Sequence, residues 1–240
     1  VYRHTMKVCM IGFINPDDAT NWRLLRACET MHIPYVIYGM PHKVTVRSFV
    51  GALRFLKANK KDCSHVWITS ISHQVLPFIY LAVKCVWPFR RPPIVHDSLI
   101  SIYDTRVFDR GWVSRWSMKA LYYYLLDWFS CKISDRVVVD TNEHGKYFQE
   151  QFYCNPKKIH RVFAGANRER FYPRKPEKKP HGVFIISFHG KLIPGMSGSE
   201  YLVEAARILK NESILFRVIG KGKLLPGFEK IKKEENLQNL

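Results

Sequence analysis

The sequence lacks the cysteine spacing of a metal site. Its cysteines stand at positions 9, 28, 63, 85, 131 and 154. None forms a C-x-x-C pair, and no histidine stands beside them at the spacing of a zinc site. Several, including Cys9 and Cys28, stand in apolar contexts. We therefore predict reduced core thiols of a cytosolic protein, and no bound metal.

Long apolar runs are also missing. No uncharged run reaches the roughly 18 residues that a membrane-spanning helix needs. The longest candidate, 75–83, is interrupted by Pro77 and followed by Lys84. The chain opens almost directly on a predicted strand, so we expect no signal peptide. These features predict a cytoplasmic protein that is not integral to a membrane, although it could lie on the inner face of one.

Acidic residues are scarce. The 240 residues hold 38 lysines and arginines against 20 acidic residues, which gives a net charge of +18. Such an excess indicates an anionic partner: nucleic acid, an anionic membrane surface or a phosphate-bearing substrate. A merely basic surface fits as well. Since the basic-aromatic motifs of RNA-binding folds and zinc fingers are absent, we predict no nucleic-acid partner.

Short apolar strands alternate with helices along the first two thirds of the chain. Strands are expected at 7–13, 35–38, 66–69, 94–96, 136–139 and 159–163, and the helices include 47–59, 74–86, 114–131 and 142–153. This order predicts an α/β fold with a parallel sheet that is covered on both faces. Ligands of such folds bind at the carboxyl ends of strands. The stretches 12–15, 69–73 and 96–98 are therefore the ones to inspect.

A proline-rich stretch divides the chain. Residues 173–180 carry three prolines with charges between them and favour neither helix nor sheet. We predict a first domain over 1–172, a linker over 173–180 and a second domain over 181–240. The second has strands at 183–188 and 214–219, a helix at 199–210 and an exposed charged helix at 229–240. One βαβ unit buries little of a sheet by itself, so we expect either docking on the first domain or, preferably, a truncated chain.

The second domain has a glycine-bearing segment between its first strand and its helix. Gly190 and Gly198 would let backbone N–H groups approach an anion, and Lys191 adds a charge. The helix that follows would offer its N-terminus to the same anion, which suits a diphosphate. An ordinary turn with a surface lysine explains the spacing equally well, and the segment is not a P-loop.

A second glycine pair ends the next predicted strand. Gly220 and Gly222 could approach a nucleotide closely, but Leu225 stands where a dinucleotide fingerprint needs glycine. An NAD-binding oxidoreductase is therefore disfavoured. A tight turn accounts for the pair at least as well.

Two polar groups end strands of the first domain. His96 and Asp97 are placed to position a substrate hydroxyl or take its proton, although Asp97 could simply cap a turn. The run 140–144 follows a later strand. Helix capping, by Asn142, explains most of that run.

Aromatic residues stand beside cations in two stretches. Residues 78–91 end in Trp87-Pro88-Phe89-Arg90-Arg91, and 110–132 has a similar character. This composition suits a membrane interface. A core helix with a basic edge is the more common outcome.

The order of these motifs resembles the family 4 glycosyltransferases. The blocks that carry the resemblance are 134–141, 157–173, 185–191, 200–206 and 216–222. The resemblance implies a GT-B fold, in which two Rossmann-like domains face a cleft. It also implies transfer of a sugar from a nucleotide-diphosphate sugar with retention, without a cofactor or an essential metal.

The resemblance also implies roles for individual residues. Gly190 and Lys191 would face the donor diphosphate, Gly198 would be the glycine of the donor loop, and Gly220 and Gly222 would line the nucleotide pocket. The predicted catalytic residues, His96 and Asp97, fall near the position of a histidine that many members carry beside the reacting sugar.

The chain departs from the family pattern in two ways. No second basic residue stands just before Gly198, which leaves Lys191 as the main phosphate cation. The family's paired-glutamate segment would lie beyond residue 240. We therefore expect this chain alone to transfer little or no sugar.

The sequence as a whole predicts a hexosyltransferase of polysaccharide biosynthesis. Its acceptor would be a glycan or a lipid-linked glycan. The alternative is a non-catalytic relative of the same fold that binds a glycan or an anionic membrane surface.

Overall fold

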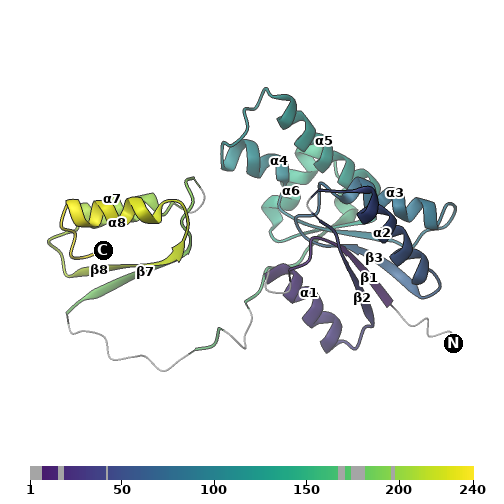
Figure 1. The fold of residues 1–240 in the computed structure, drawn as a ribbon, viewed down its shortest axis with the longest axis horizontal. Helices are drawn as coiled ribbons and strands as arrows, with labels where there is room; N and C mark the ends of the chain where they lie inside the picture. The colour runs from purple at the N-terminus through teal and green to yellow at the C-terminus, as the bar shows by residue number, and fades with distance from the viewer. Residues whose placement is uncertain (1–6, 16–18, 42, 167–170, 174–181, 196–197) are drawn as a thin grey trace. The chain divides into compact units, whose positions relative to one another are not determined.

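The structure, a computed structural model, describes residues 7–15, 19–41, 43–166, 171–173, 182–195 and 198–240. The chain divides into two units, of which the first comprises Val1–Phe108 and Val113–Tyr172. The second comprises Asp109–Trp112 and Pro173–Leu240. We describe each unit by itself (Figure 1).

The first unit is built on six parallel strands in the order β2-β1-β3-β4-β5-β6. Their bounds are β1 Lys7–Gly12, β2 Tyr35–Gly39, β3 Cys63–Ile68, β4 Ile94–Leu99, β5 Arg136–Val139 and β6 Ile159–Arg161. Each pairing is parallel, as between Met10 of β1 and Trp67 of β3. The predicted parallel sheet is confirmed. Its order reverses at β1, since β2 and β3 lie on either side of it.

Helices connect the strands. Their bounds are α1 Ala19–Thr30, α2 Val46–Ala58, α3 Leu76–Val86, α4 Ile102–Asp104, α5 Met118–Ile133 and α6 Asn142–Phe152. A π-helical turn, Thr105–Asp109, follows α4, and a 3₁₀ turn, Pro156–Lys158, precedes β6. The helix predicted at 114–131 begins later, because Ser117 is its N-cap and accepts a hydrogen bond from the Ala120 N–H.

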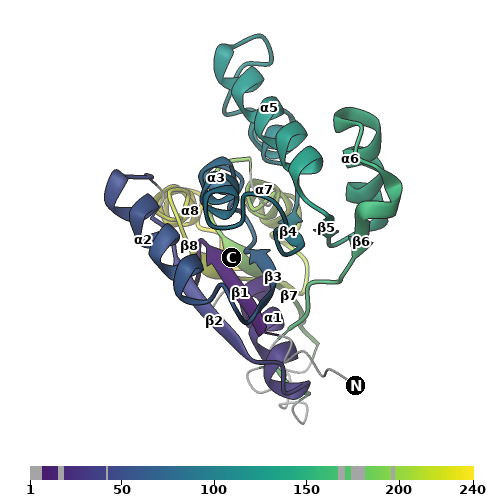
Figure 2. The same ribbon diagram turned by 90° about the vertical axis from the view of Figure 1, so that its right-hand side faces the viewer.

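Helices lie on both faces of the sheet, as predicted, but they do not cover it evenly. On one side α2 and α3 pack against Ile11 and Ile68, and on the other α1 packs against Val8 and Met10 (Figures 1 and 2). Alternate residues of a strand point to opposite faces, so Trp67 lies on the side of α1. On that side an apolar groove runs over β3, β4 and β5.

The second unit pairs β7, Phe184–Lys191, with β8, Ile214–Lys221, in parallel. Helices α7, Glu200–Ile208, and α8, Leu225–Glu234, pack on these strands through one core that includes Leu192, Val203 and Phe228 (Figure 1). Burying one face of both strands gives this short unit a core of its own.

The strands of the second unit are longer than predicted. Gly190 and Lys191 belong to β7 and not to a loop, and Gly220 belongs to β8. The two glycines are paired in register, because main-chain pairing can continue where no side chain contributes. The last helix, α8, begins at Leu225, four residues before the predicted 229, and ends at Glu234. Leu237, which follows the helix, is buried, although this stretch was predicted to be exposed.

Candidate functional site

The carboxyl edge of the first sheet, where β1, β3 and β4 end, is rich in hydroxyl groups. The Phe13 N–H donates to Ser72 Oγ over 2.8 Å, and Thr69 Oγ1 donates to Phe13 O over 2.9 Å. Gly12 has a φ of +142°, and a Cβ there would collide with the side chains of Thr69 and Ser72. Glycine is therefore required for the chain after β1 to approach the segment after β3.

A buried polar cluster lies beside this edge. His73 Nε2 is 2.9 Å from Ser98 Oγ and 3.5 Å from Asp127 Oδ1. The Asp127 carboxylate accepts hydrogen bonds from the Ser101 hydroxyl and the Tyr103 N–H, over 2.6 and 2.9 Å. The cluster thereby joins the segment after β3, the end of β4 and helix α5.

Burial sets the protonation of this cluster. It lowers the pKa of His73 to about 4 and, together with the nearby His73, lowers the pKa of His96. It raises the pKa of Asp127 to about 7, against the hydrogen bonds from Ser101 and Tyr103. Both imidazoles are therefore neutral at pH 7, where Asp127 titrates. A group that titrates near neutral pH can exchange a proton in catalysis.

The cluster is closed to solvent. Exposure is 2% for His73 and 0% for His96 and Asp127. The His96 ring meets His73 edge to face, with centroids 4.8 Å apart, and neither of its nitrogens has a hydrogen-bond partner among the described residues. These side chains stand behind the edge and do not face a substrate directly.

The structure does not bring His96 and Asp97 together. Neighbours in a strand point to opposite faces, so His96 joins His73 on the side of α3 while Asp97 lies on the side of α1. Arg23 of α1 binds the Asp97 carboxylate at 2.9 Å. The same guanidinium donates to the carbonyls of Val162 and Phe163. Asp97 therefore anchors α1 and the segment after β6.

Sequence reasoning missed two members of this edge. Asp127 is the one carboxylate of a mostly apolar and aromatic helix, and a lone acidic residue in such a helix could have indicated a buried functional group. Arg23 carried no signal, because it is one of several polar residues of α1. His73 lay within a stretch marked for inspection, although no role was assigned to it.

The run 140–144 is a helix start, as its sequence indicated, but the cap differs. Thr141, and not Asn142, is the N-cap of α6 and accepts from the His144 N–H. His144 Nδ1 lies 2.5 Å from Asp140 Oδ1. The contact between Asp140 and His144 thus lies at the start of α6.

The carboxyl ends of β7 and β8 form a second edge, which we call the lysine edge after Lys191, Lys221 and Lys223. Lys191 and Lys221 are register partners, and all three lysines are exposed. Parallel pairing thus places two lysines at neighbouring positions of adjacent strands. Neighbouring positive charges attract an anion.

Close backbone packing explains the glycines of this edge. A Cβ at Gly220 would collide with the carbonyl oxygen of Gly190, and one at Gly222 with that of Leu192. The main-chain pairing of β7 and β8 reaches this point, since the Leu192 N–H donates to Lys221 O over 3.0 Å. Close approach of the two backbones therefore explains Gly220, which lies in β8 and not in a turn, and Gly222 just after it.

The segment before α7 is tied back by Glu200. Its carboxylate accepts from the Gly195 N–H over 3.1 Å. Backbone N–H groups of Glu200 and Gly195 hold the pKa of this carboxyl below its ordinary value. Gly198 has a φ of +63°, the left-handed conformation that favours glycine, directly before the helix. Glu200 thus holds Gly195, and Gly198 turns the chain directly before α7.

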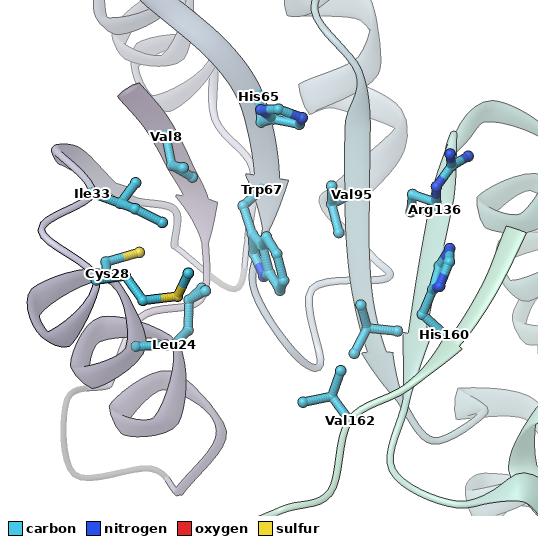
Figure 3. Close-up of a pocket in the computed structure, with 13 residues that line it drawn as sticks. Val8, Leu24, Cys28, Ile33, His65, Trp67, Val95, Arg136, His160 and Val162 are labelled. Carbon is cyan, nitrogen blue, oxygen red and sulfur yellow. The ribbon is translucent and has the colours of Figure 1, made fainter. Parts of the chain in front are cut away.

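An apolar groove of about 480 Å³ lies elsewhere, on the face of the first sheet beside α1. Figure 3 shows Trp67 and Val95 on its floor, Leu24 on the α1 side and His65, Arg136 and His160 along it. It includes neither His96 nor Asp97. Its lining is mostly apolar, with His65, Arg136 and His160 as polar side chains along it.

Within the described ranges, the structure holds no group of three or more histidine, cysteine or acidic side chains that could bind a metal ion. Nor is any helix in those ranges long and apolar enough to cross a membrane.

No protein-family model and no curated protein sequence matches the chain. Solved structures do match. Anabaena Alr3699/HepE, solved with UDP and glucose, aligns with a TM-score of 0.60 and 11% identity over 98% of this chain and 67% of its own. WaaB, a lipopolysaccharide outer core galactosyltransferase, aligns with a TM-score of 0.59 and 11% identity over 97% of this chain and 66% of its own.

A third structure is similar over less of its length. A mutant of S. aureus TarM, solved with Fondaparinux, α-GlcNAc-glycerol and UDP, aligns with a TM-score of 0.52 and 12% identity. The alignment covers 80% of this chain and 35% of TarM. The chain thus spans about two thirds of HepE and WaaB and about a third of TarM. At these identities the likeness shows the fold, and it confirms the predicted α/β fold of GT-B type.

Proposed function

We propose that the chain is part of a retaining glycosyltransferase of the hexosyltransferase type. It would transfer a sugar from a nucleotide-diphosphate sugar to a glycan or lipid-linked acceptor. The observation that carries the proposal is the extent of the fold likeness, which reaches 98% of this chain and so includes both of its units. HepE, the protein in that alignment, was solved with UDP and glucose.

In this proposal the lysine edge binds the donor diphosphate. Lys191 and Lys221 supply two neighbouring positive charges, and Gly190 and Gly220 let the two strands approach closely beside them. Cations at a departing phosphate stabilise its developing charge, which is the main electrostatic need of this reaction. Sequence reasoning named only Lys191, and parallel register adds Lys221. Gly222, directly after β8, and Gly198, just before α7, belong to the same proposed donor site.

The first unit would hold the acceptor at its carboxyl edge. His96 and Asp97 are buried, so we propose that they position this edge and do not touch the substrate. Asp97 would do so through Arg23, and His96 through His73. We also propose a place at the inner face of a membrane and a role in polysaccharide biosynthesis, in keeping with a lipid-linked acceptor.

Nucleotide binding tests the proposal directly. We expect saturation-transfer NMR to detect UDP on the chain, with GDP and ADP as comparisons for the base. Lys191→Ala with Lys221→Ala should weaken UDP binding by about tenfold or more, since each lost ion contact is worth roughly 1 kcal/mol. Lys233→Ala, an exposed lysine in the last turn of α8, is the matched control and should change nothing.

Two results would overturn the proposal. One is the absence of binding by all three nucleotides at millimolar concentration. The other is UDP binding that the double variant leaves intact, because the ligand would then occupy a site other than the lysine edge.

A further inference from the structure

Helix α5 turns an apolar face outward. Its exposed side chains are Met118, Leu121, Tyr122, Leu125 and Trp128, which we call the outer face of α5. Met118 is 80% exposed, and Leu121, Tyr122 and Leu125 are 47–48% exposed. Spacings of three and four residues place them along one side of the helix. A surface helix of a globular protein carries polar residues there, so this helix departs from the ordinary pattern.

The opposite side of α5 is already used by the core. Tyr123, Leu126 and Cys131 are buried there, together with the Asp127 carboxylate. The outer face is therefore not a displaced core stripe. It is a second apolar stripe on the same helix.

The neighbouring helix also carries exposed apolar side chains. Helix α3 meets α5 through the rings of Tyr80 and Phe129, whose centroids are 6.1 Å apart. Its exposed residues include Phe78 and Leu81, and Phe89 just beyond its end is 98% exposed. Several large exposed apolar side chains on neighbouring helices are typical of an interaction surface.

Cations frame the outer face at both ends. Arg115 lies over the ring of Trp116, 5.0 Å from its centroid, and Trp116 is 87% exposed. At the other end Lys132 lies 5.5 Å from the centroid of Trp128. Lys119 is exposed within the first turn. The one carboxylate of the helix, Asp127, is buried and presents no negative charge to a partner.

This combination identifies the partner by its chemistry. Tryptophan and tyrosine prefer the boundary between headgroups and acyl chains, and lysine and arginine reach from it toward phosphates. Protein interfaces, by contrast, are depleted in lysine. The net charge of +18 adds attraction to an anionic surface over a longer range.

We propose that the outer face of α5, with Phe78, Leu81 and Phe89, docks on an anionic lipid bilayer. The apolar side chains enter the headgroup boundary while the helix lies in the plane of the membrane. Lys119 and Lys132 bind lipid phosphates from the two ends of the face. The proposal rests on this surface alone and requires no bound donor.

Sedimentation with vesicles, without any nucleotide, tests it. The chain should pellet with vesicles of equal parts phosphatidylcholine and phosphatidylglycerol and much less with phosphatidylcholine alone. Leu121→Gln with Leu125→Gln should lower the partition coefficient by about tenfold or more, given roughly 0.8 kcal/mol per buried CH₂. Lys119→Glu with Lys132→Glu should reduce the preference for anionic vesicles.

Controls separate docking from misfolding and self-association. Ile208→Gln changes an apolar residue of α7 that is 80% exposed, more than either leucine, and should leave the partition unchanged. Thermal melts should show that the α5 variants stay folded. The proposal is wrong if the leucine variants bind vesicles like the parent chain. It is equally wrong if the parent chain forms a dimer without lipid and the leucine variants abolish that dimer. The outer face of α5 would then bind a second copy of the chain and not a membrane. Failure here would leave the UDP test unaffected.

Discussion

The guanidinium of Arg23 lies 2.9 Å from the carboxylate of Asp97, and it also donates to the carbonyls of Val162 and Phe163. The side chains are 14% and 2% exposed. One contact therefore links α1, the centre of the sheet and the segment after β6. Asp97, which the sequence predicted to be catalytic, therefore helps to hold distant parts of the first unit together through Arg23.

Removing this guanidinium should destabilise the first unit. Arg23→Ala removes the guanidinium that binds the buried Asp97 carboxylate, and breaking such a pair costs about 3 kcal/mol. Arg26→Ala, one turn further along α1, breaks an exposed pair with Glu29 and should cost less than about 1 kcal/mol. Urea denaturation followed by tryptophan fluorescence measures both, since five of the six tryptophans, all but Trp112, belong to the first unit. Equal costs for the two variants would contradict the role of Arg23.

The buried cluster should give the stability of the first unit a distinctive pH dependence. The folded pKa of Asp127, about 7, exceeds its ordinary value of 3.8, so the folded chain holds this proton more tightly than the unfolded chain. Stability from Asp127 is therefore lost as pH rises from about 4 through 7. His73, lowered to about 4 from 6.5, acts in the opposite sense and favours folding as pH rises through the same range.

Asp127→Asn should separate these two contributions. The variant loses the Asp127 dependence, so the difference between its unfolding free energy and that of the parent should grow with pH, by up to about 1.4 kcal/mol per unit. Urea denaturation at several pH values between 4 and 8 measures it. A constant difference for Asp127→Asn would show that its proton is not coupled to folding.

Two glycines of the second unit should respond to alanine with opposite signs. Gly220→Ala forces a Cβ against the backbone of Gly190 and should destabilise β7 and β8 by about 1–3 kcal/mol. Gly227 lies within α8 with open space around it, so Gly227→Ala should stabilise by about 0.5–1 kcal/mol. Hydrogen exchange of the amides in 184–221 reports this unit. Protection that Gly220→Ala leaves unchanged would contradict the close approach.

Thiol reactivity should single out one cysteine. All six thiols are free, and only Cys85 is exposed. We expect one fast reaction of the folded chain with dithionitrobenzoate and slow reaction of the others, which must wait for local opening. Cys85→Ser should remove the fast phase. Loss of two or more fast thiols per chain would show that the predicted core thiols are more accessible than the structure has them.

Much of the fold was predictable from the sequence because it depends on local pattern. The apolar runs at 7–12, 94–96 and 136–139 and the helical spacing at 47–59 have one consistent interpretation, a series of alternating strands and helices. Prolines and charges led us to predict a linker over 173–180 by composition alone. Most of that stretch, 174–180, lies outside the described residues, and the division into 1–172 and 181–240 stays a prediction. The excess of lysine and arginine likewise needs no structure to indicate an anionic partner.

Tertiary structure alone decided which of these residues meet. The side-chain period of a strand sent His96 and Asp97 to opposite faces, and parallel register placed Lys221 beside Lys191. Packing decided that α5 buries the side with Asp127 and leaves Leu121 and Leu125 outside. The sequence determined the elements, whose pattern is local. Their neighbours are set by contacts between residues far apart in the chain, which no local pattern encodes.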